Sequence, residues 1–265
     1  MRSAECFEGG TQVIALETVA VAFSMFSAIP MPQFEWNERN MRYALCAFPL
    51  VGAVIALGMW GWGRLCLLLS LPELLRGAGL CLMPVLITGG IHLDGYCDTC
   101  DALAAHSDAE KRQEILKDPH LGAFAAIWLC VYFIADLALW TALPDISLPI
   151  LLGIFCLSRT LSGLALTLFP LRAGSGLARS FSEAADRRRV RTVLLFFAAA
   201  LSLVLLLLHA VEIVLAAALV FWHYRRMCVR DFGGLSGDLA GWFLQTAELW
   251  MLAAAVLRHY VEAIL

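Results

Sequence analysis

The fold class of this chain is decided by the segment TVLLFFAAALSLVLLLLH, residues 192–209, which contains no Asp, Glu, Lys or Arg. A helix needs about 20 mostly apolar residues to cross the hydrocarbon core of a bilayer. The rest of the 265-residue chain has a similar character, since 61% of its residues are hydrophobic and only 15% are charged. Soluble domains contain about 25% charged residues. The sequence therefore excludes a soluble fold and predicts an integral membrane protein with membrane lipid as its surroundings.

Charge and cysteine content exclude two further classes. The formal net charge is −3 and the sequence pI is about 6.1, whereas nucleic-acid binders carry basic stripes on polar folds. We therefore expect no nucleic-acid partner. The nine cysteines lie mostly inside apolar runs, where they are typical of small buried hydrophobic residues and not of a disulfide framework.

Six further segments resemble residues 192–209 and are predicted to span the membrane, namely 43–71, 74–93, 121–143, 146–169, 211–225 and 239–257. A weaker segment at 11–29 contains Glu17 and is followed by a Pro-Met-Pro sequence, so it either spans the membrane or enters and returns. No basic segment with a small-residue cleavage site follows Met1, and no removable signal peptide is expected. The sequence thus predicts an all-α, polytopic membrane helix bundle that forms a single domain over residues 1–265, with about seven spans.

Basic residues are concentrated in four loops, around residues 39–42, 111–117, 172–191 and 225–230. Alternate threading of the spans puts all four loops on one side and the short neutral or acidic loops on the other. Because Lys and Arg are enriched in cytoplasmic loops, the basic side is predicted to face the cytosol of a bacterial inner membrane. A cytoplasmic position of this loop is enough to account for the arginines at 187–191. The alternative is that they bind a substrate phosphate.

Carboxylates are concentrated in residues 89–101, GGIHLDGYCDTCD. In a helix, with about 100° per residue, Asp94, Asp98 and Asp101 share one narrow face. Carboxylate oxygens suit Mg²⁺, which also binds substrate phosphates, and a cation would relieve the repulsion among the three side chains. We therefore predict a metal site formed by these residues. A solvated acidic face at the end of a helix is the alternative.

Other residues of this segment have competing interpretations. The glycines at 89 and 90 allow a sharp turn after the preceding span or simply end its helix. His92 either orients a ligand or donates a proton, or it is only a polar anchor at the membrane interface. Cys97 and Cys100 form a C-x-x-C pair, but no second pair exists in the chain, so a zinc site is the weaker interpretation.

A short amphipathic helix is predicted after this segment. Ser107 and Glu110 fit a capping box at its start, and Lys117 and Asp118 lie at its end. This last pair either holds a phosphate opposite the acidic segment or forms an ordinary interfacial ion pair.

Two polar sites interrupt apolar runs further along the chain. Arg159 lies within a predicted span, where an arginine normally has a partner or a ligand. The sequence GGLSGD at 233–238 precedes the last span, and a glycine-rich turn at a helix N-terminus presents backbone N–H groups to an anion. Ser236, Gly237 and Asp238 of this turn, and Glu248 in the helix that follows, are predicted to bind substrate.

Together these features resemble the cobalamin synthase family, the membrane enzymes that attach the lower nucleotide loop of vitamin B12. The block Gly-Gly-x-His-Leu-Asp-Gly is the most specific part of the resemblance. The matching features follow the same order along most of the chain, and they are FPLVG at 48–52, residues 89–101, Lys117, Asp118, Gly122, residues 233–238 and Glu248.

The resemblance implies an Mg²⁺-dependent adenosylcobinamide-GDP ribazoletransferase. A ribose hydroxyl of α-ribazole, or of its 5′-phosphate, would attack the corrinoid-linked phosphoryl group of adenosylcobinamide-GDP, giving adenosylcobalamin, or its 5′-phosphate, and GMP. Phosphoryl transfer depends mainly on positioning and charge neutralisation, which the predicted metal site would supply. Asp101 is the expected base for the attacking hydroxyl, and His92 is the other expected catalytic residue. Whether the chain forms a homo-oligomer is left open.

Two rival functions are retained. One is a membrane phosphotransferase acting on a CDP-alcohol, whose Asp-rich signature is faintly similar to residues 89–101. The other is a secondary transporter, which normally holds its ion and substrate near the bilayer midplane, whereas the carboxylates here lie at the predicted cytosolic ends of helices. The released nucleotide distinguishes the three functions.

Overall fold

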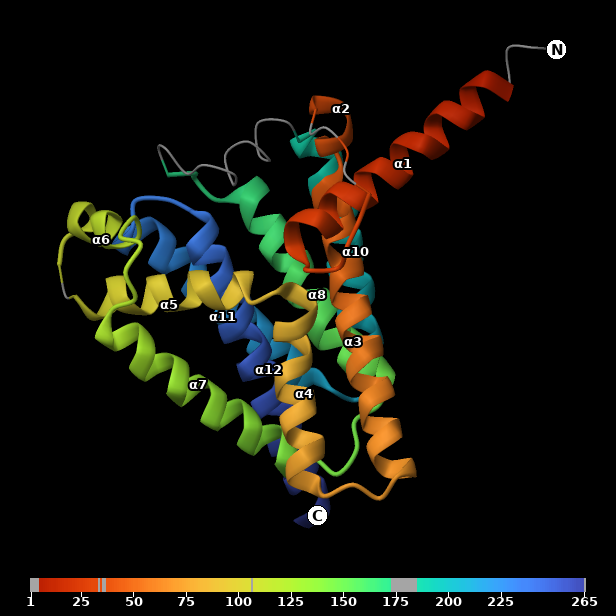
Figure 1. Ribbon diagram of the computed structural model, residues 1–265, viewed down its shortest axis with the longest axis vertical. Coiled ribbons are helices and arrows are strands. Elements are labelled where there is room, and N and C mark those ends of the chain that lie inside the picture. Colours follow the sequence, from red (N-terminus) through yellow and green to blue (C-terminus); the bar gives the residue numbers. More distant parts are fainter. Residues whose placement is uncertain (1–4, 33, 35–36, 106, 173–184, 265) are drawn as a thin grey trace.

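The computed structural model describes residues 5–32, 34, 37–105, 107–172 and 185–264. Within these ranges the chain is helical, and its only strand-like pairing is an isolated parallel bridge between Leu171 and Leu235. The predicted all-α bundle is confirmed (Figure 1). Its helices are α1 (Glu5–Phe26), α2 (Glu38–Met41), α3 (Ala44–Leu68), α4 (Glu73–Thr88), α5 (Ile91–Ala104), α6 (Ala109–Ile115), α7 (Ala123–Ala142), α8 (Leu148–Leu168), α10 (Arg187–Leu207), α11 (Val211–Asp231) and α12 (Gly237–Ile264).

The expected number of seven spans is too high for the described residues. Five helices, α3, α7, α8, α10 and α12, are long and apolar enough to cross a membrane, and α4 and α5 together raise the number to six. Helix α11 does not qualify, because its second half, HYRRMCVRD, is polar. It runs beside α12 in the bundle all the same.

The predicted span at 74–93 is broken by its two glycines. Helix α4 ends at Thr88, and Gly89 and Gly90 follow with φ angles of 67° and 79°. Only glycine adopts this left-handed backbone without steric cost. The chain turns by 97° into α5, which consequently runs across the direction of α4 and packs against α12 and α7 (Figure 1). Both interpretations of the glycines hold, since they end one helix and turn sharply into the next.

The N-terminal segment enters the bundle without crossing it. The apolar part of α1, Ala15–Phe26, is shorter than a span. After α1 the backbone N–H of Ala28 donates to the carbonyl oxygen of Ile87 at 2.8 Å, which holds the chain against the end of α4. The chain then reaches α2 near the end of the bundle where α3 begins (Figure 1). The structure therefore favours the re-entrant interpretation.

Ion pairs connect the loops at each end of the bundle. At one end Arg42 pairs with Asp186 at 3.3 Å, which joins the basic loop before α3 to the start of α10. At the opposite end Arg64 pairs with Asp145 at 3.1 Å. The first and third basic loops thus meet at one end, and the second and fourth are joined to each other by the pair between Arg112 and Asp231. Arg179, in the third basic loop, lies outside the described residues.

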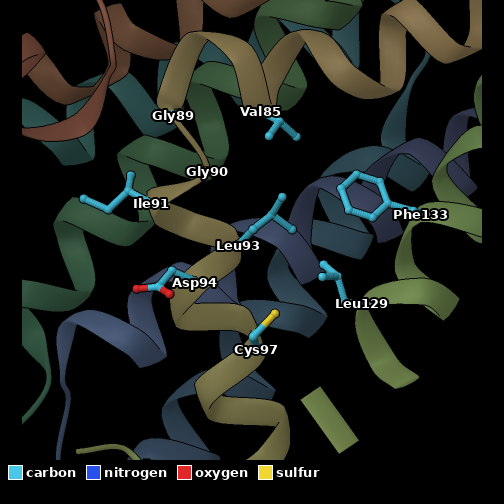
Figure 2. Close-up of a pocket in the computed structure, with 9 residues that line it drawn as sticks. All are labelled: Val85, Gly89, Gly90, Ile91, Leu93, Asp94, Cys97, Leu129 and Phe133. Carbon is cyan, nitrogen blue, oxygen red and sulfur yellow. The ribbon is translucent and has the colours of Figure 1, made fainter. Parts of the chain in front are cut away.

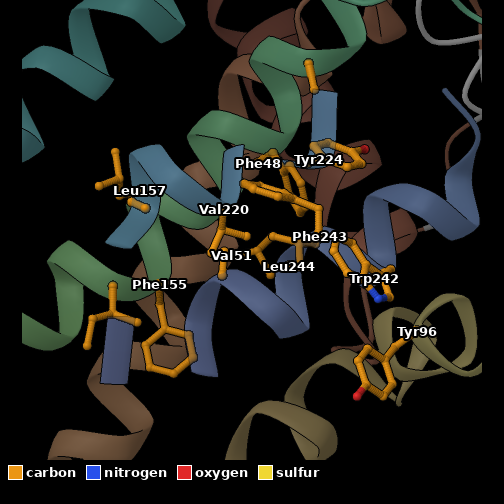
Figure 3. Close-up of a cluster of buried hydrophobic side chains, with 14 of the residues drawn as sticks. Phe48, Val51, Tyr96, Phe155, Leu157, Val220, Tyr224, Trp242, Phe243 and Leu244 are labelled. Carbon is orange, nitrogen blue, oxygen red and sulfur yellow. The ribbon is translucent and has the colours of Figure 1, made fainter. Parts of the chain in front are cut away.

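Close packing of α3 against α8 depends on Gly52. A Cβ atom at this position would lie 2.2 Å from the backbone oxygen of Phe155 and 2.9 Å from Cδ of Arg159. This contact continues into an apolar cluster in which Phe48 and Val51 of α3 approach α8 and α12 (Figure 3). The FPLVG sequence at 48–52 therefore has a packing role.

We expect Gly52→Ala to destabilise the bundle by about 1–3 kcal/mol, because the added methyl group must separate α3 from α8. Gly61→Ala is the matched control in the same helix, since nothing lies within 4 Å of a Cβ at that position. Thermal unfolding in detergent measures both variants. Equal stability of the two would contradict the assigned role of Gly52.

Candidate functional site

The site is built where α5 crosses the start of α12. A Cβ at Gly95 would lie 2.8 Å from Cα of Asp238, and a Cβ at Gly241 would lie 2.7 Å from the backbone oxygen of His92. Two glycines facing each other let the two backbones touch. The structure therefore brings residues 89–101 and 233–238 together in space, although they are distant in the sequence.

Four carboxylates, those of Asp94, Asp98, Asp101 and Asp238, form what we call the carboxylate cluster. Asp94 is exposed and the other three are half-buried. Burial is the largest cause of a raised pKa at Asp98, and together with the negative charges of Asp94, Asp238 and Asp101 it brings that pKa to about 6. The residues of the cluster thus repel one another, and a cation would relieve that repulsion.

The expected magnesium site stays a prediction. Within the described residues, no group of three or more His, Cys, Asp or Glu side chains is already arranged to hold a metal ion. The cluster offers only hard oxygen donors, which suit Mg²⁺. Zinc stays the weaker interpretation, because the described residues place no third His, Cys, Asp or Glu with Cys97 and Cys100 in an arrangement that could hold a metal ion.

Asp101 lies at the edge of the cluster and contacts the start of α7. Its Oδ1 accepts a hydrogen bond from the backbone N–H of Ala125 at 3.2 Å, and a Cβ at Gly122 would lie 1.5 Å from its Oδ2. A carboxylate is stabilised by the positive end of a helix. Asp101 therefore caps α7 in addition to any catalytic role.

His92 is buried between α5 and α3. Its ring centroid lies 6.0 Å from that of Phe48, and its Nε2 has no hydrogen-bond partner. Burial, together with the positive charge of Arg159, lowers the pKa of His92 to about 3. The ring is therefore neutral at physiological pH. This argues against the proton-donor interpretation, and its burial argues against a surface anchor.

Lys117 and Asp118 do not join the carboxylate cluster. Both are exposed, and Oδ1 of Asp118 accepts a hydrogen bond from the backbone N–H of His120 at 3.0 Å and contacts its Nδ1 at 2.6 Å. The structure thus favours a local surface role for Asp118.

The predicted capping box is displaced by one residue. The N-cap of α6 is Asp108, whose side chain accepts from the backbone N–H of Lys111 at 2.9 Å. The hydroxyl of Ser107 is buried without a partner. The expectation that Ser107 caps this helix was wrong, because Asp108 caps equally well and the helix begins after it.

Arg159 and Glu248 are partners of each other. Arg159 is fully buried in α8, and its Nη1 pairs with the carboxylate of Glu248 in α12. The hydroxyl of Ser158 also donates to that carboxylate at 2.8 Å. Both residues were predicted to bind substrate, and the structure gives each an internal partner within the bundle.

The glycine-rich turn at 233–238 is held against the end of α8. The backbone N–H of Leu235 donates to the carbonyl oxygen of Pro170 at 2.8 Å. Ser236 is buried, and its hydroxyl accepts from the backbone N–H of Leu239 at 3.4 Å and contacts Asp238 at 3.3 Å. Gly237 is exposed, with nothing within 4 Å of a Cβ. The turn therefore presents an open surface at the start of α12.

A pocket of about 500 Å³ lies beside Asp94, between α4, α5 and α7 (Figure 2). Its walls are mainly apolar, with the Asp94 carboxylate as the charged group. The lining residues are Val85, Gly89, Gly90, Ile91, Leu93, Asp94, Cys97, Leu129 and Phe133. The site thus combines charged and apolar surfaces, which suits a substrate with both kinds of group.

Sequence reasoning missed two buried charged residues. Arg76 of α4 donates to the backbone oxygens of Trp140, at 3.4 Å, and of Leu143, and so satisfies the end of α7. Asp136 of α7 is buried and interacts with Cys81 and Trp140. A single charged residue inside an apolar span was the available signal for each.

These features define a polytopic helical membrane protein with a carboxylate-lined site at one end of its bundle. A family model described as cobalamin-5-phosphate synthase matches residues 18–256, and the chain belongs to this family.

Similar proteins extend over nearly the whole chain. A protein of Lachnoclostridium phytofermentans named adenosylcobinamide-GDP ribazoletransferase is 42% identical over 249 residues, covering 93% of this chain and 95% of its own length. Proteins of the same name from Clostridium botulinum strain Alaska E43 and Clostridium perfringens strain SM101 are 31% and 29% identical, each over 89% of this chain and over 96% and 95% of their own lengths. No solved structure matches the chain.

Two substitutions distinguish the capping role of Asp101 from its expected role as a base. We expect Asp101→Asn to keep the thermal stability of the protein, because an amide oxygen still accepts from Ala125, and to lower turnover strongly, because it removes a base. Asp101→Ala should lose turnover and also about 1 kcal/mol of stability. Near-normal turnover in Asp101→Asn would show that this residue only caps α7.

Proposed function

We propose that this chain is an adenosylcobinamide-GDP ribazoletransferase acting in the assembly of the cobalamin nucleotide loop. The observation that carries this proposal is the family match over residues 18–256. Relatives of that name align along nearly the whole chain. The meeting of residues 89–101 with the turn at 233–238 supports the same function, because it places carboxylates beside a helix start that favours phosphate.

In the proposed reaction, a hydroxyl of α-ribazole, or of its 5′-phosphate, attacks the corrinoid-linked phosphorus of adenosylcobinamide-GDP. A new P–O bond forms to the ribose, the P–O bond to the guanosine phosphate breaks, and GMP leaves with that bonding pair. The hydroxyl proton passes to a base, for which Asp101 is our candidate. The open surface at Gly237 and the apolar pocket beside Asp94 give room for the nucleotide and for an apolar part of the substrate.

We further propose that Asp94, Asp98 and Asp238 hold Mg²⁺ when substrate is bound. Their donors are all carboxylate oxygens, and the charges of Asp94 and Asp238 both act on Asp98, whose pKa is raised by burial and by these charges. When bound, the ion would neutralise phosphate charge during transfer. Asp101 faces α7 instead, so we assign it to the edge of this site.

The basic end of the bundle is proposed to face the cytosol of a bacterial inner membrane. The loops at this end carry most of the arginines and lysines, which favour the cytoplasmic side. The carboxylate cluster lies next to two of these loops, since α5 leads into α6 and α11 leads into α12, and Arg112 of α6 pairs with Asp231, at the end of α11, at 3.2 Å. A soluble nucleotide substrate could reach the cluster from this side.

A secondary transporter is disfavoured by the position of the site. The carboxylate cluster lies where α5 crosses the start of α12, whereas a transporter holds its substrate near the bilayer midplane. A CDP-alcohol phosphotransferase is disfavoured by the family match.

We expect Asp94→Asn and Asp98→Asn each to reduce Mg²⁺-dependent release of GMP from adenosylcobinamide-GDP by at least about 100-fold, because each removes charge that would hold the ion. Glu114→Gln, which removes an exposed carboxylate paired with Lys111, should leave the rate unchanged. The assay is run with purified protein in detergent, with and without a chelator. Near-normal Mg²⁺-dependent turnover in either aspartate variant would overturn the metal assignment, and release of CMP from a CDP-alcohol would overturn the proposed function.

Orientation is tested with single cysteines introduced into a cysteine-free variant. Glu110, exposed in α6, represents the basic end, and Glu73, exposed at the start of α4, represents the opposite end. An impermeant thiol reagent applied to intact cells should label Glu73→Cys and miss Glu110→Cys. The reverse pattern would place the carboxylate cluster away from cytosolic nucleotides.

A further inference from the structure

Arg172, just after α8, carries a buried positive charge that the site as described does not use. The residue is only 7% exposed, and its Nε and Nη1 have no hydrogen-bond partner. Burying a charged donor without a partner costs its full desolvation free energy. The described part of the chain does not supply the acceptor that these two nitrogens need.

The backbone of Arg172 is fixed beside the glycine-rich turn. Its N–H donates to the carbonyl oxygen of Leu235 at 3.0 Å, within the bridge between Leu171 and Leu235. Gly234 permits this contact, because its φ is 149° and a Cβ there would lie 2.7 Å from the backbone nitrogen of Arg172. Arg172 is therefore held at the start of α12, independently of where its guanidinium binds.

The charges around Arg172 select an anion. The guanidinium lies close enough to Asp238 for their charges to interact, yet Arg172 has no ion pair in the described structure. The start of α12 adds the positive end of a helix dipole. A group that binds the guanidinium must carry negative charge. To approach the carboxylate cluster as well, it must bring a cation with it. A phosphate accompanied by a divalent metal ion meets both requirements.

We propose that Arg172 binds a phosphate group of the guanosine nucleotide, opposite the carboxylate cluster. This inference rests on the proposed function and deepens it, because it identifies the side chain whose positive charge binds the phosphate. Arginine suits this task, since its planar fork donates two parallel hydrogen bonds to phosphate oxygens. Lys117, the cation first expected there, is exposed.

The test compares the affinities of the protein for GMP and for guanosine, which differ only by the phosphate. Both are measured by calorimetry with purified protein in detergent free of anionic lipid, in the presence of Mg²⁺. Wild type should bind GMP more tightly than guanosine. Arg172→Gln should reduce the ratio of the two affinities by about tenfold or more, and Arg172→Lys, which keeps the charge without the fork, should reduce it less.

Arg191→Gln is the matched control. Arg191 is also partly buried, lies near the end of α8 and has an unpartnered Nε, but its Nη2 donates to the backbone oxygen of Thr167 at 2.7 Å, which fixes its guanidinium within the protein. Its replacement should leave the GMP-to-guanosine ratio unchanged. An equal fall in the ratio in Arg191→Gln would show that only the general positive field matters and would overturn the assignment to Arg172.

Other outcomes are equally decisive. A wild-type ratio in Arg172→Gln overturns the proposal. If that variant does not fold, as judged by thermal unfolding, Arg172→Lys is used in its place, and a wild-type ratio in Arg172→Lys overturns the proposal.

If phosphatidylglycerol added to the micelles removes the difference between wild type and variant, the guanidinium binds a lipid headgroup instead. If wild type releases no GMP from adenosylcobinamide-GDP, the proposed function fails, and binding of inorganic pyrophosphate by wild type and Arg172→Gln still tests Arg172.

Discussion

The contact between α5 and α12 at two glycines is the constraint on which the site depends. Gly95 and Gly241 let the two backbones touch, and any side chain at either position would push the helices apart. This contact holds the carboxylates of α5 against Asp238 at the start of α12. The turn at Gly89 and Gly90 is its counterpart, because α5 could not reach α12 if it continued the direction of α4. Four glycines thus convert an apolar bundle into a scaffold for charged groups.

Inside the bundle, burial of charge follows a different rule. Burial removes Arg159 and Glu248 from water, which costs desolvation free energy. Each is stabilised by the other and by Ser158. Replacing one partner alone would leave an uncompensated charge in apolar surroundings. Gly52 contributes to the same arrangement, since it brings α3 against Phe155 and Arg159. The FPLVG sequence, the arginine and the glutamate therefore form one packing unit, at some distance along α12 from the carboxylate cluster.

The carboxylate cluster and Arg172 together provide separated charges of opposite sign. Negative groups gather on α5 and the first turn of α12, and burial together with their mutual repulsion raises the pKa of Asp98. Arg172 supplies a buried cation with unpaired donors, close enough to Asp238 for their charges to interact. Such an arrangement is suited to phosphoryl transfer, in which the protein mainly positions substrates and compensates phosphate charge. The mainly apolar pocket beside Asp94 adds a surface for a less polar part of the substrate.

The sequence by itself determined the all-α membrane fold, the helix that carries Asp94, Asp98 and Asp101, and the family. These follow from local patterns, because apolar length decides insertion into the bilayer and residue spacing decides which side chains share a helix face. It overestimated the number of spans, since two glycines break the segment at 74–93 by 97° and the second half of α11 is too polar to qualify. Only the tertiary structure decided the partners: Glu248 for Arg159, the start of α7 for Asp101, and the start of α12 for Arg172. A side chain's partner depends on which helices pack together and at what angle, and that information is not local to any one segment of the chain.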